Sequence, residues 1–159
     1  MKLETPIAIA DLFEAHLCVS DLDRSIRFYG EQLGLPLAHV VPARNVAFFW
    51  IGAPGKSMLG LWAEIAVAGS RAAHLAFQVE LADLHAAPSR LGNAGIKPLD
   101  FAGALTEEPV VLAWMPAASV YFRDPDNNLL EFITMLPGPE RPDLEVLPWS
   151  DWVRRTSVP

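Results

Sequence analysis

Carboxylate and imidazole side chains of a kind that binds metal ions occur in two similar stretches of this sequence. Glu14 and His16 lie in the stretch EAHLCV, and His74 begins the stretch HLAFQV. Residues two apart on a strand share a face, so Glu14 and His16 should point the same way. A buried carboxylate or imidazole without a partner is costly, which favours pairing or coordination. Together the two groups suit a divalent ion such as Mn, Fe, Ni, Zn or Mg.

The two stretches indicate an internal repeat. Each runs into an acidic helix start, and their alignment puts Glu14 opposite His74. A turn followed by a strand also occurs twice, as PGKSMLG and PDNNLLE, and aligning these puts Gly60 opposite Glu131. The second pair is 11 residues further apart than the first (60 to 131 against 14 to 74), so the second copy contains an insertion. We expect it within residues 102–116.

The first copy has the pattern of a strand, a helix and three strands. Leu22, Ile26, Tyr29 and Leu33 recur at helical spacing. Ser20 should cap this helix, and Gly34 fits its C-terminal end. The expected strands are residues 13–19, 37–41, 46–51 and 57–64.

The second copy repeats this order. Its helix should cover residues 81–94 and end at Gly95, with a kink or restart at Pro88. The expected strands are residues 72–79, 96–101, 119–123 and 129–135. The tail should be an irregular arm with a short helix at 150–155, and we expect Trp149 and Trp152 to anchor it to the body or to a partner subunit.

These elements predict an α+β fold of two βαβββ modules, residues 12–66 and 72–135, followed by a C-terminal arm, residues 136–159. Each unit is too small to bury both faces of its sheet, so the two must pack together. We expect a pseudo-twofold axis, with mixed sheets curling around a shared cleft. The inserted segment should cover one mouth of that cleft or pack across a partner.

Composition narrows the class of protein. Hydrophobic residues make up 52% and charged residues 19%, which is enough apolar material for a core. The net charge of −7 argues against a nucleic-acid partner. The single cysteine, Cys18, excludes a disulfide framework, and no apolar run predicts a membrane span or a signal peptide. We expect a cytoplasmic protein, and a homodimer because Phe48, Phe49, Trp50 and the aromatic tail could form an apolar surface.

Two motifs carry a family resemblance. The stretch HLCVSDLDRSIRFY at residues 16–29, followed by LGL, resembles the opening of glyoxalase, bleomycin-resistance and extradiol-dioxygenase proteins. The stretch VYFRDPDNNLLE at residues 120–131 is similar to their closing strands, usually written as a DPDG motif followed by Glu. The resemblance covers about residues 12–135 and indicates the vicinal-oxygen-chelate superfamily.

In the family, the metal ligands occupy four positions, and the resemblance implies that these correspond here to Glu14, Gly60, His74 and Glu131. Glu14 stands where a histidine is usual, although a carboxylate is a competent ligand. Gly60 has no side chain to offer, so the pattern is closer to three-ligand members, such as fosfomycin-resistance transferases and extradiol dioxygenases, than to four-ligand glyoxalases. The open fourth place would accept water or substrate. Against this stands the reading of His74 and Glu131 as structural, hydrogen-bonded residues.

Further side chains are candidates for the same cleft. Three roles are open for His16: it could bind the metal in place of Glu14, hydrogen-bond to a ligand, or accept a proton. Tyr121 occupies a place where the family often has a substrate-contacting tyrosine. Four more residues are candidates for substrate binding. Trp62 and Glu64 share strand parity with Gly60, Arg123 shares it with Tyr121, and Trp114 lies in the inserted segment.

The leading hypothesis is a divalent-metal enzyme acting on a small oxygenated molecule as a lyase, isomerase, transferase or dioxygenase. The metal would polarise vicinal oxygens of the substrate as a Lewis acid. The alternative is a metal-free binding protein that sequesters a small molecule, as bleomycin-resistance proteins do. A structural or regulatory role is a third reading.

Overall fold

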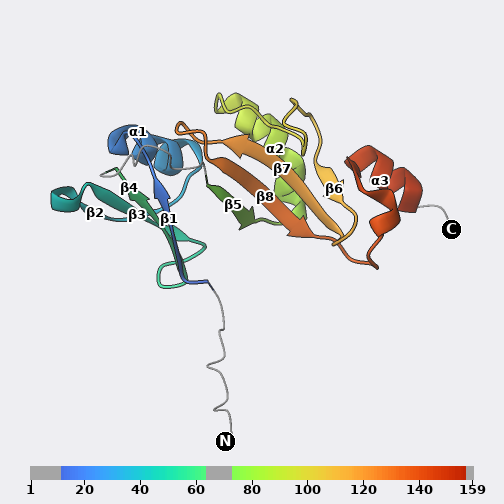
Figure 1. Ribbon diagram of the computed structural model, residues 1–159, viewed down its shortest axis with the longest axis horizontal. Helices are drawn as coiled ribbons and strands as arrows, with labels where there is room; N and C mark the ends of the chain where they lie inside the picture. Colours follow the sequence, from blue (N-terminus) through green and yellow to red (C-terminus); the bar gives the residue numbers. More distant parts are fainter. Residues whose placement is uncertain (1–11, 64–72, 157–159) are drawn as a thin grey trace, which may run out of the picture. The chain divides into compact units, whose positions relative to one another are not determined.

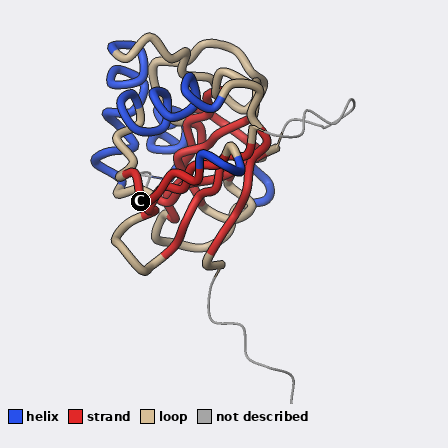
Figure 2. Tube along the Cα trace, turned by 90° about the vertical axis from the view of Figure 1, so that its left-hand side faces the viewer, coloured by secondary structure: helices blue, strands red, loops and turns tan. Residues whose placement is uncertain are grey.

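The computed structural model of this chain describes residues 12–63 and 73–156. The chain divides after residue 70 into two compact units, each built around one sheet (Figure 1; strands red in Figure 2). Glu64 and the outer ends of the strands expected at 57–64 and 72–79 lie outside the described residues.

Module one has the expected order of elements. These are β1 (Glu14–Cys18), α1 (Leu22–Ile26), η1 (Arg27–Gln32), β2 (Leu37–Val41), η2 (Pro42–Arg44), β3 (Val46–Ile51) and β4 (Ser57–Trp62). The sheet order is β1-β4-β3-β2, with β1 and β4 parallel and the other pairs antiparallel. The first and last strands of the module are therefore neighbours.

The helical segment of module one differs from the prediction at its start and along its length. Asp21, not Ser20, caps it, because the Asp21 side chain accepts a hydrogen bond from the Arg24 amide. From Arg27 the segment continues as a π-helix, a wider coil. Of the four residues at helical spacing, Tyr29 is buried, whereas Leu22, Ile26 and Leu33 are partly exposed. Ser25 and Phe28 are buried beside Tyr29.

The sheet of module one has one apolar face, covered by the helix, and one open face. Leu17, Phe49, Leu59 and Leu61 are almost completely buried. The ring of Phe49 lies beside that of Tyr29 in η1, which identifies this as the helix-covered face. Side chains alternate along a strand, so the residues between them belong to the open face.

Module two adds a C-terminal arm to the same pattern. Its elements are β5 (His74–Gln78), α2 (Leu81–Asn93), β6 (Val110–Leu112), β7 (Ala117–Arg123), β8 (Leu129–Met135), η3 (Pro142–Leu144), β9 (Val146–Pro148) and α3 (Trp149–Thr156). The sheet order is β5-β8-β7-β6-β9, with β5 and β8 parallel. Helix α2 runs through Pro88 without a restart and packs against β7 and β8.

Strand register confirms the repeat. Glu14 pairs with Met58 and His16 with Gly60 in module one. The corresponding pairs in module two are His74 with Leu129 and Ala76 with Glu131. Glu14 and His74 are thus equivalent, and so are Gly60 and Glu131. The chain has the predicted α+β fold of two βαβββ modules.

The insertion lies inside the second strand of module two. In place of a strand at 96–101, only Leu99 pairs with Tyr121, as His39 pairs with Phe48 in module one. The chain then turns at Gly103, which has a φ of 85°, and Leu105 folds back on Leu99. It rejoins the sheet at Val110. The prediction of a continuous strand at 96–101 was wrong because the excursion interrupts it.

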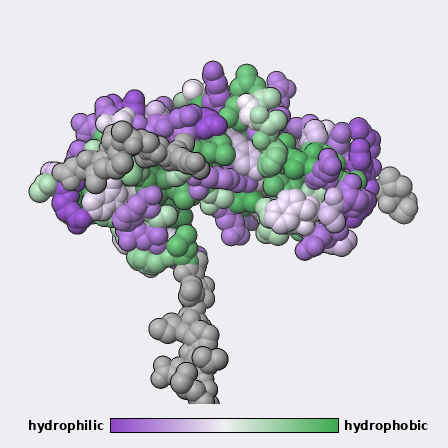
Figure 3. Space-filling view, viewed as in Figure 1, coloured by the Kyte–Doolittle hydropathy of each residue, from purple (hydrophilic) through white to green (hydrophobic). Residues whose placement is uncertain are grey.

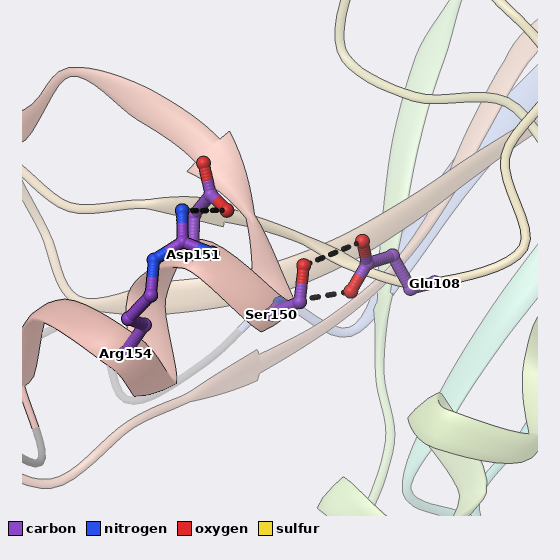
Figure 4. A network of polar contacts seen from close by, with 4 residues as sticks. All are labelled: Glu108, Ser150, Asp151 and Arg154. Carbon is purple, nitrogen blue, oxygen red and sulfur yellow. Dashed lines mark hydrogen bonds and ion pairs between the residues drawn. The ribbon is translucent and has the colours of Figure 1, made fainter.

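The C-terminal arm packs on its own module. β9 pairs with β6, and the Glu108 carboxylate accepts hydrogen bonds from the amide and hydroxyl of Ser150 at the start of α3 (Figure 4). Trp149 lies edge-on to His85, and Trp152 is buried. Trp152 and Phe49, which had suggested an interface, are therefore enclosed within their own modules, while the homodimer stays a prediction.

Replacing Trp152 tests this anchoring. Trp152→Ala should lower the free energy of unfolding by about 3–5 kcal/mol, the usual cost of removing a large buried aromatic side chain. Urea denaturation followed by circular dichroism measures the change. The matched control is Val153→Ala on the exposed side of the same helix, which should cost less than about 1 kcal/mol. Equal effects of the two variants would mean that the arm is not anchored through Trp152.

Candidate functional site

A buried carboxylate is the centre of the open face of module two. Glu131 is 5% exposed, and its two oxygens have different partners. Oε2 lies 2.9 Å from His74 Nε2, and Oε1 accepts a hydrogen bond of 2.5 Å from the Ser119 hydroxyl. These donors offset the cost of burying a charged group. The His74 side chain is half exposed, so the pair is accessible at its imidazole end.

The DPDNN turn holds this pair in register. The Asp124 carboxylate accepts hydrogen bonds from the amides of Asp126 and Asn128. Asn127 has a φ of 69°, a conformation that asparagine tolerates and that the family motif assigns to glycine. The Asn128 side chain then accepts a hydrogen bond from the Ala73 amide, one residue before His74. This turn thereby positions His74 beside β8.

Tyr121 completes the cluster. Burial of the phenol, reinforced by the neighbouring charge of Glu131 and a hydrogen bond to it, raises the pKa of Tyr121 well above its usual value. Its ring lies 6.2 Å from that of His74 and 6.1 Å, edge-on, from that of Phe101 in the inserted segment. Tyr121 is therefore a neutral hydrogen-bond donor at ordinary pH, bordered by an exposed aromatic residue.

Module one has its own carboxylate and imidazole pair. Glu14 Oε1 lies 2.9 Å from His16 Nε2, and both side chains are about two-fifths exposed. The His16 imidazole leans across the neighbouring strand and lies directly over Gly60. The pair is more open to water than its counterpart in module two, so its ionic attraction contributes little to stability.

Aromatic rings fix the position of the His16 imidazole. It stacks on Trp62 with ring centroids 5.5 Å apart, and Phe48 approaches it edge-on at 6.1 Å. The Arg44 guanidinium lies 4.6 Å from the centre of the Trp62 ring. Trp62 thus lies on the same face of the sheet as His16, in line with its shared strand parity with Gly60.

The donor chemistry of both pairs fits a divalent ion. Each module contributes one carboxylate and one imidazole, a set typical of Mn, Fe, Ni and Zn sites. Within each module, as far as it is described, no three such side chains gather as a complete metal site.

Other candidates lie elsewhere or belong to the turns. Arg123 is exposed and donates a hydrogen bond to the Asn127 carbonyl, which fastens the turn before β8. Trp114 is exposed in the turn between β6 and β7, beyond Ala117. Tyr121 is four positions along β7 from Ala117, a backbone distance of about 13 Å. Trp114 is thus separated from the Glu131 cluster.

Sequence reasoning missed several residues of the two clusters. Ser119 contacts Glu131, and its shared strand parity with Tyr121 was the available signal for that contact. Phe48 and Arg44 gave no signal, because their contacts depend on how β3 and η2 lie beside β4. Phe101 depends likewise on the path of the insertion.

A match between this sequence and a protein family identifies the family of the chain. Residues 9–132 match the family described as the Glyoxalase/Bleomycin resistance protein/Dioxygenase superfamily. The chain belongs to this superfamily. Its fold is one that commonly binds small molecules, and many members of the superfamily use a divalent metal.

Relatives extend over most of the chain. The YraH protein of Bacillus subtilis (strain 168) is 27% identical over 133 residues, 79% of this chain and 98% of that protein. The integron cassette protein HFX_CASS4, from the mobile metagenome of Halifax Harbour sewage outfall, is 30% identical, covers 80% of this chain and 100% of its own, and has a TM-score of 0.66. Lactoylglutathione lyase from Agrobacterium tumefaciens is 25% identical, with 81% and 94% covered and a TM-score of 0.59. Superfamily membership thus rests on both sequence and fold.

None of the helices in residues 12–63 and 73–156 has the length and apolar character needed to cross a bilayer.

The turn that positions His74 gives a second prediction. Asn128→Ala removes the acceptor of the Ala73 amide and a donor to Asp124. It should lower the free energy of unfolding by about 1–3 kcal/mol, because buried polar partners are left unsatisfied. Urea denaturation measures the loss. Asn93→Ala, at the exposed end of α2, is the control and should stay within about 0.5 kcal/mol of wild type.

The raised pKa of Tyr121 predicts how stability depends on pH. The folded chain holds the phenol proton more tightly than the unfolded chain, whose tyrosines titrate near pH 10. The contribution is therefore complete below about pH 10 and is lost as pH rises above it. Urea denaturation at pH 8 and pH 11 should show a smaller loss of stability in Tyr121→Phe than in wild type. Identical losses would contradict the assignment.

Proposed function

We propose that this protein is a divalent-metal-dependent enzyme acting on a small molecule with vicinal oxygens. Glu14, His74 and Glu131 would hold the ion, with His16 beside them. The observation that supports this most is that each module presents one carboxylate and one imidazole 2.9 Å apart. In module two they come from the first and last strands, and in module one both come from the first strand.

The ion would supply Lewis-acid polarisation of the substrate oxygens. The protein's own groups would orient the reactants. Ser119 fixes one oxygen of Glu131 and leaves the other directed at His74. Such supporting hydrogen bonds hold ligands in place and typically matter 10–100-fold for affinity or activity, an order-of-magnitude figure.

Other side chains would bind and position the substrate. Tyr121, kept neutral by its raised pKa, would redirect its single hydroxyl proton from Glu131 to a substrate oxygen. Trp62 and Phe101 would contact its apolar parts, since Trp62 stacks on His16 and Phe101 lies edge-on to Tyr121. His16 would accept a proton or bind the ion directly. The partner molecule is therefore an oxygenated compound with an apolar group.

The similarity to lactoylglutathione lyase supports a lyase, isomerase, transferase or dioxygenase over other reaction classes. The same proposal includes a cytoplasmic location and a homodimer. Light scattering at micromolar concentration tests the second of these.

The alternative is a metal-free protein that sequesters a small molecule. The favouring observation is that each imidazole already pairs with its carboxylate, so both groups are satisfied without an ion. The stacked rings of His16 and Trp62 would suit a flat ligand.

Metal stoichiometry separates the two functions. Purified protein reloaded with Mn, Fe, Ni or Zn in turn should bind one ion per chain. His74→Ala should lose this binding while remaining folded, because a half-exposed imidazole contributes little to the core. Elemental analysis measures the bound ion, and circular dichroism reports the fold.

His85→Ala is the matched control for the loss of an imidazole. His85 lies on α2 against Trp149 and should be dispensable for metal binding. Wild-type protein that binds none of the four ions would contradict the enzyme and favour the sequestering protein.

A further inference from the structure

The excursion in module two brings three apolar side chains to the edge of the Glu131 cluster. Leu99 pairs with Tyr121 through two backbone hydrogen bonds of 2.7 and 2.9 Å, and Tyr121 pairs in turn with Glu131. Residues opposite one another across a sheet share a face, so the Leu99 side chain lies on the face of Tyr121 and Glu131. Phe101 follows two residues later, and Leu105 pairs with Leu99. We call Leu99, Phe101 and Leu105 the apolar border of the cluster.

The apolar border is exposed although its backbone is fixed. Phe101 is 59% exposed and Leu105 70%, so neither side chain contributes much to the core. The Asp100 carboxylate accepts a hydrogen bond of 2.8 Å from the Ala104 amide, and the Asp100 amide donates one of 2.8 Å to the Ala104 carbonyl. Gly103 closes the turn. Apolar side chains held in water beside polar groups are typical of a surface that contacts a ligand or a partner.

Module one has no counterpart of this border within residues 12–63. Its equivalent strand, β2 (Leu37–Val41), stays beside β3 along its whole length. The repeated unit therefore folds without an excursion at this place. Because the fold does not require the apolar border, its side chains are available for binding.

Tyr121 joins the polar cluster to the apolar border. Its hydroxyl is hydrogen-bonded to Glu131, and its ring lies 6.1 Å from the Phe101 ring in an edge-on arrangement. Aromatic rings attract one another at such separations, and a third ring placed beside them gains the same kind of contact. A ligand oxygen at the Tyr121 hydroxyl and a ligand ring against Phe101 would be separated by about the width of one phenol ring.

We propose that the apolar border is a subsite for an aromatic ring, and that the substrate carries an aryl group on one of its two oxygen-bearing carbons. This inference rests on the proposed function and names its substrate class. The short separation between the Tyr121 hydroxyl and Phe101 requires the ring to be attached close to the oxygens. An aliphatic group would reach the same side chains but would lack the contacts between rings.

Two neutral glycols that differ in one group test the subsite. Phenylethylene glycol and propylene glycol share vicinal hydroxyls and carry a phenyl and a methyl group, respectively. Wild type should bind the phenyl compound on the order of 10-fold more tightly, as is usual for apolar contacts of this size. Phe101→Ala should lower this preference roughly 3-fold or more, because it removes the ring contact. NMR titration with and without Zn²⁺ measures the dissociation constants.

Three further variants show whether the position of the Phe101 ring matters. Asp100→Ala removes the acceptor of the Ala104 amide, so it should loosen the turn and lower the preference for the phenyl compound. Asp100→Asn keeps an acceptor at this place and should retain the preference. Met135→Ala is the matched control, because Met135 is 63% exposed on the same sheet, about 13 Å along β8 from Glu131. Circular dichroism verifies that each variant is folded.

The outcomes separate this inference from the proposed function. Binding of neither glycol, equal binding of both, or a preference that is unchanged in Phe101→Ala would overturn the subsite. Metal stoichiometry would leave the proposed function intact in these cases if the protein binds Zn²⁺. A preference that falls in Phe101→Ala, in protein that binds no Zn²⁺, would support the subsite and overturn the metal-dependent function. An unchanged preference with a lower mass of Phe101→Ala in light scattering would identify the border as a subunit contact instead.

Discussion

Parallel pairing of the first and last strands is the constraint on which each module depends. A strand that enters the sheet first and pairs in parallel with the strand that enters last needs a crossover, and the helix provides it. In module two, Glu131 pairs with Ala76, and His74 is two positions from Ala76 on the same strand. The side chains of His74 and Glu131 therefore meet across the two strands. In module one the same pairing sets His16 directly opposite Gly60. The pair of module two and the place of His16 beside Gly60 are therefore products of strand register, whereas Glu14 and His16 meet because they are two residues apart on one strand.

The two modules stabilise their imidazoles by different means. His74 is held by a hydrogen bond to a carboxylate that is itself buried and supported by Ser119. His16 is held by aromatic rings, with a carboxylate that water reaches. A buried network has a large penalty for losing one member, whereas stacked rings lose contact area gradually. Substitutions should therefore be tolerated less well around Glu131 than around Glu14.

Much of the fold could be predicted from the sequence because its signals are local. Alternation, turn residues and the two matched stretches gave the strands and aligned Glu14 with His74, which the register confirms. The π-helical turn after Ile26 escaped prediction, since periodicity assumes a regular α-helix. The position of Leu99 was predicted as part of a strand, but the break after it depends on a hairpin that closes on Leu105. The His16 ring could not be placed over Gly60 from sequence, because that contact depends on which strand lies beside β1.

The short strand β9 has a consequence for how the sheet of module two ends. Exposed sheet edges are templates onto which other chains can add, and natural proteins protect them. Here the edge strand has three residues, and one of them, Pro148, has no amide proton to donate. The helix α3 follows at once and ends the run of backbone groups. A strand of another chain could form only a few backbone hydrogen bonds with so short an edge. The C-terminal arm therefore also protects this edge of the sheet against edge-to-edge aggregation.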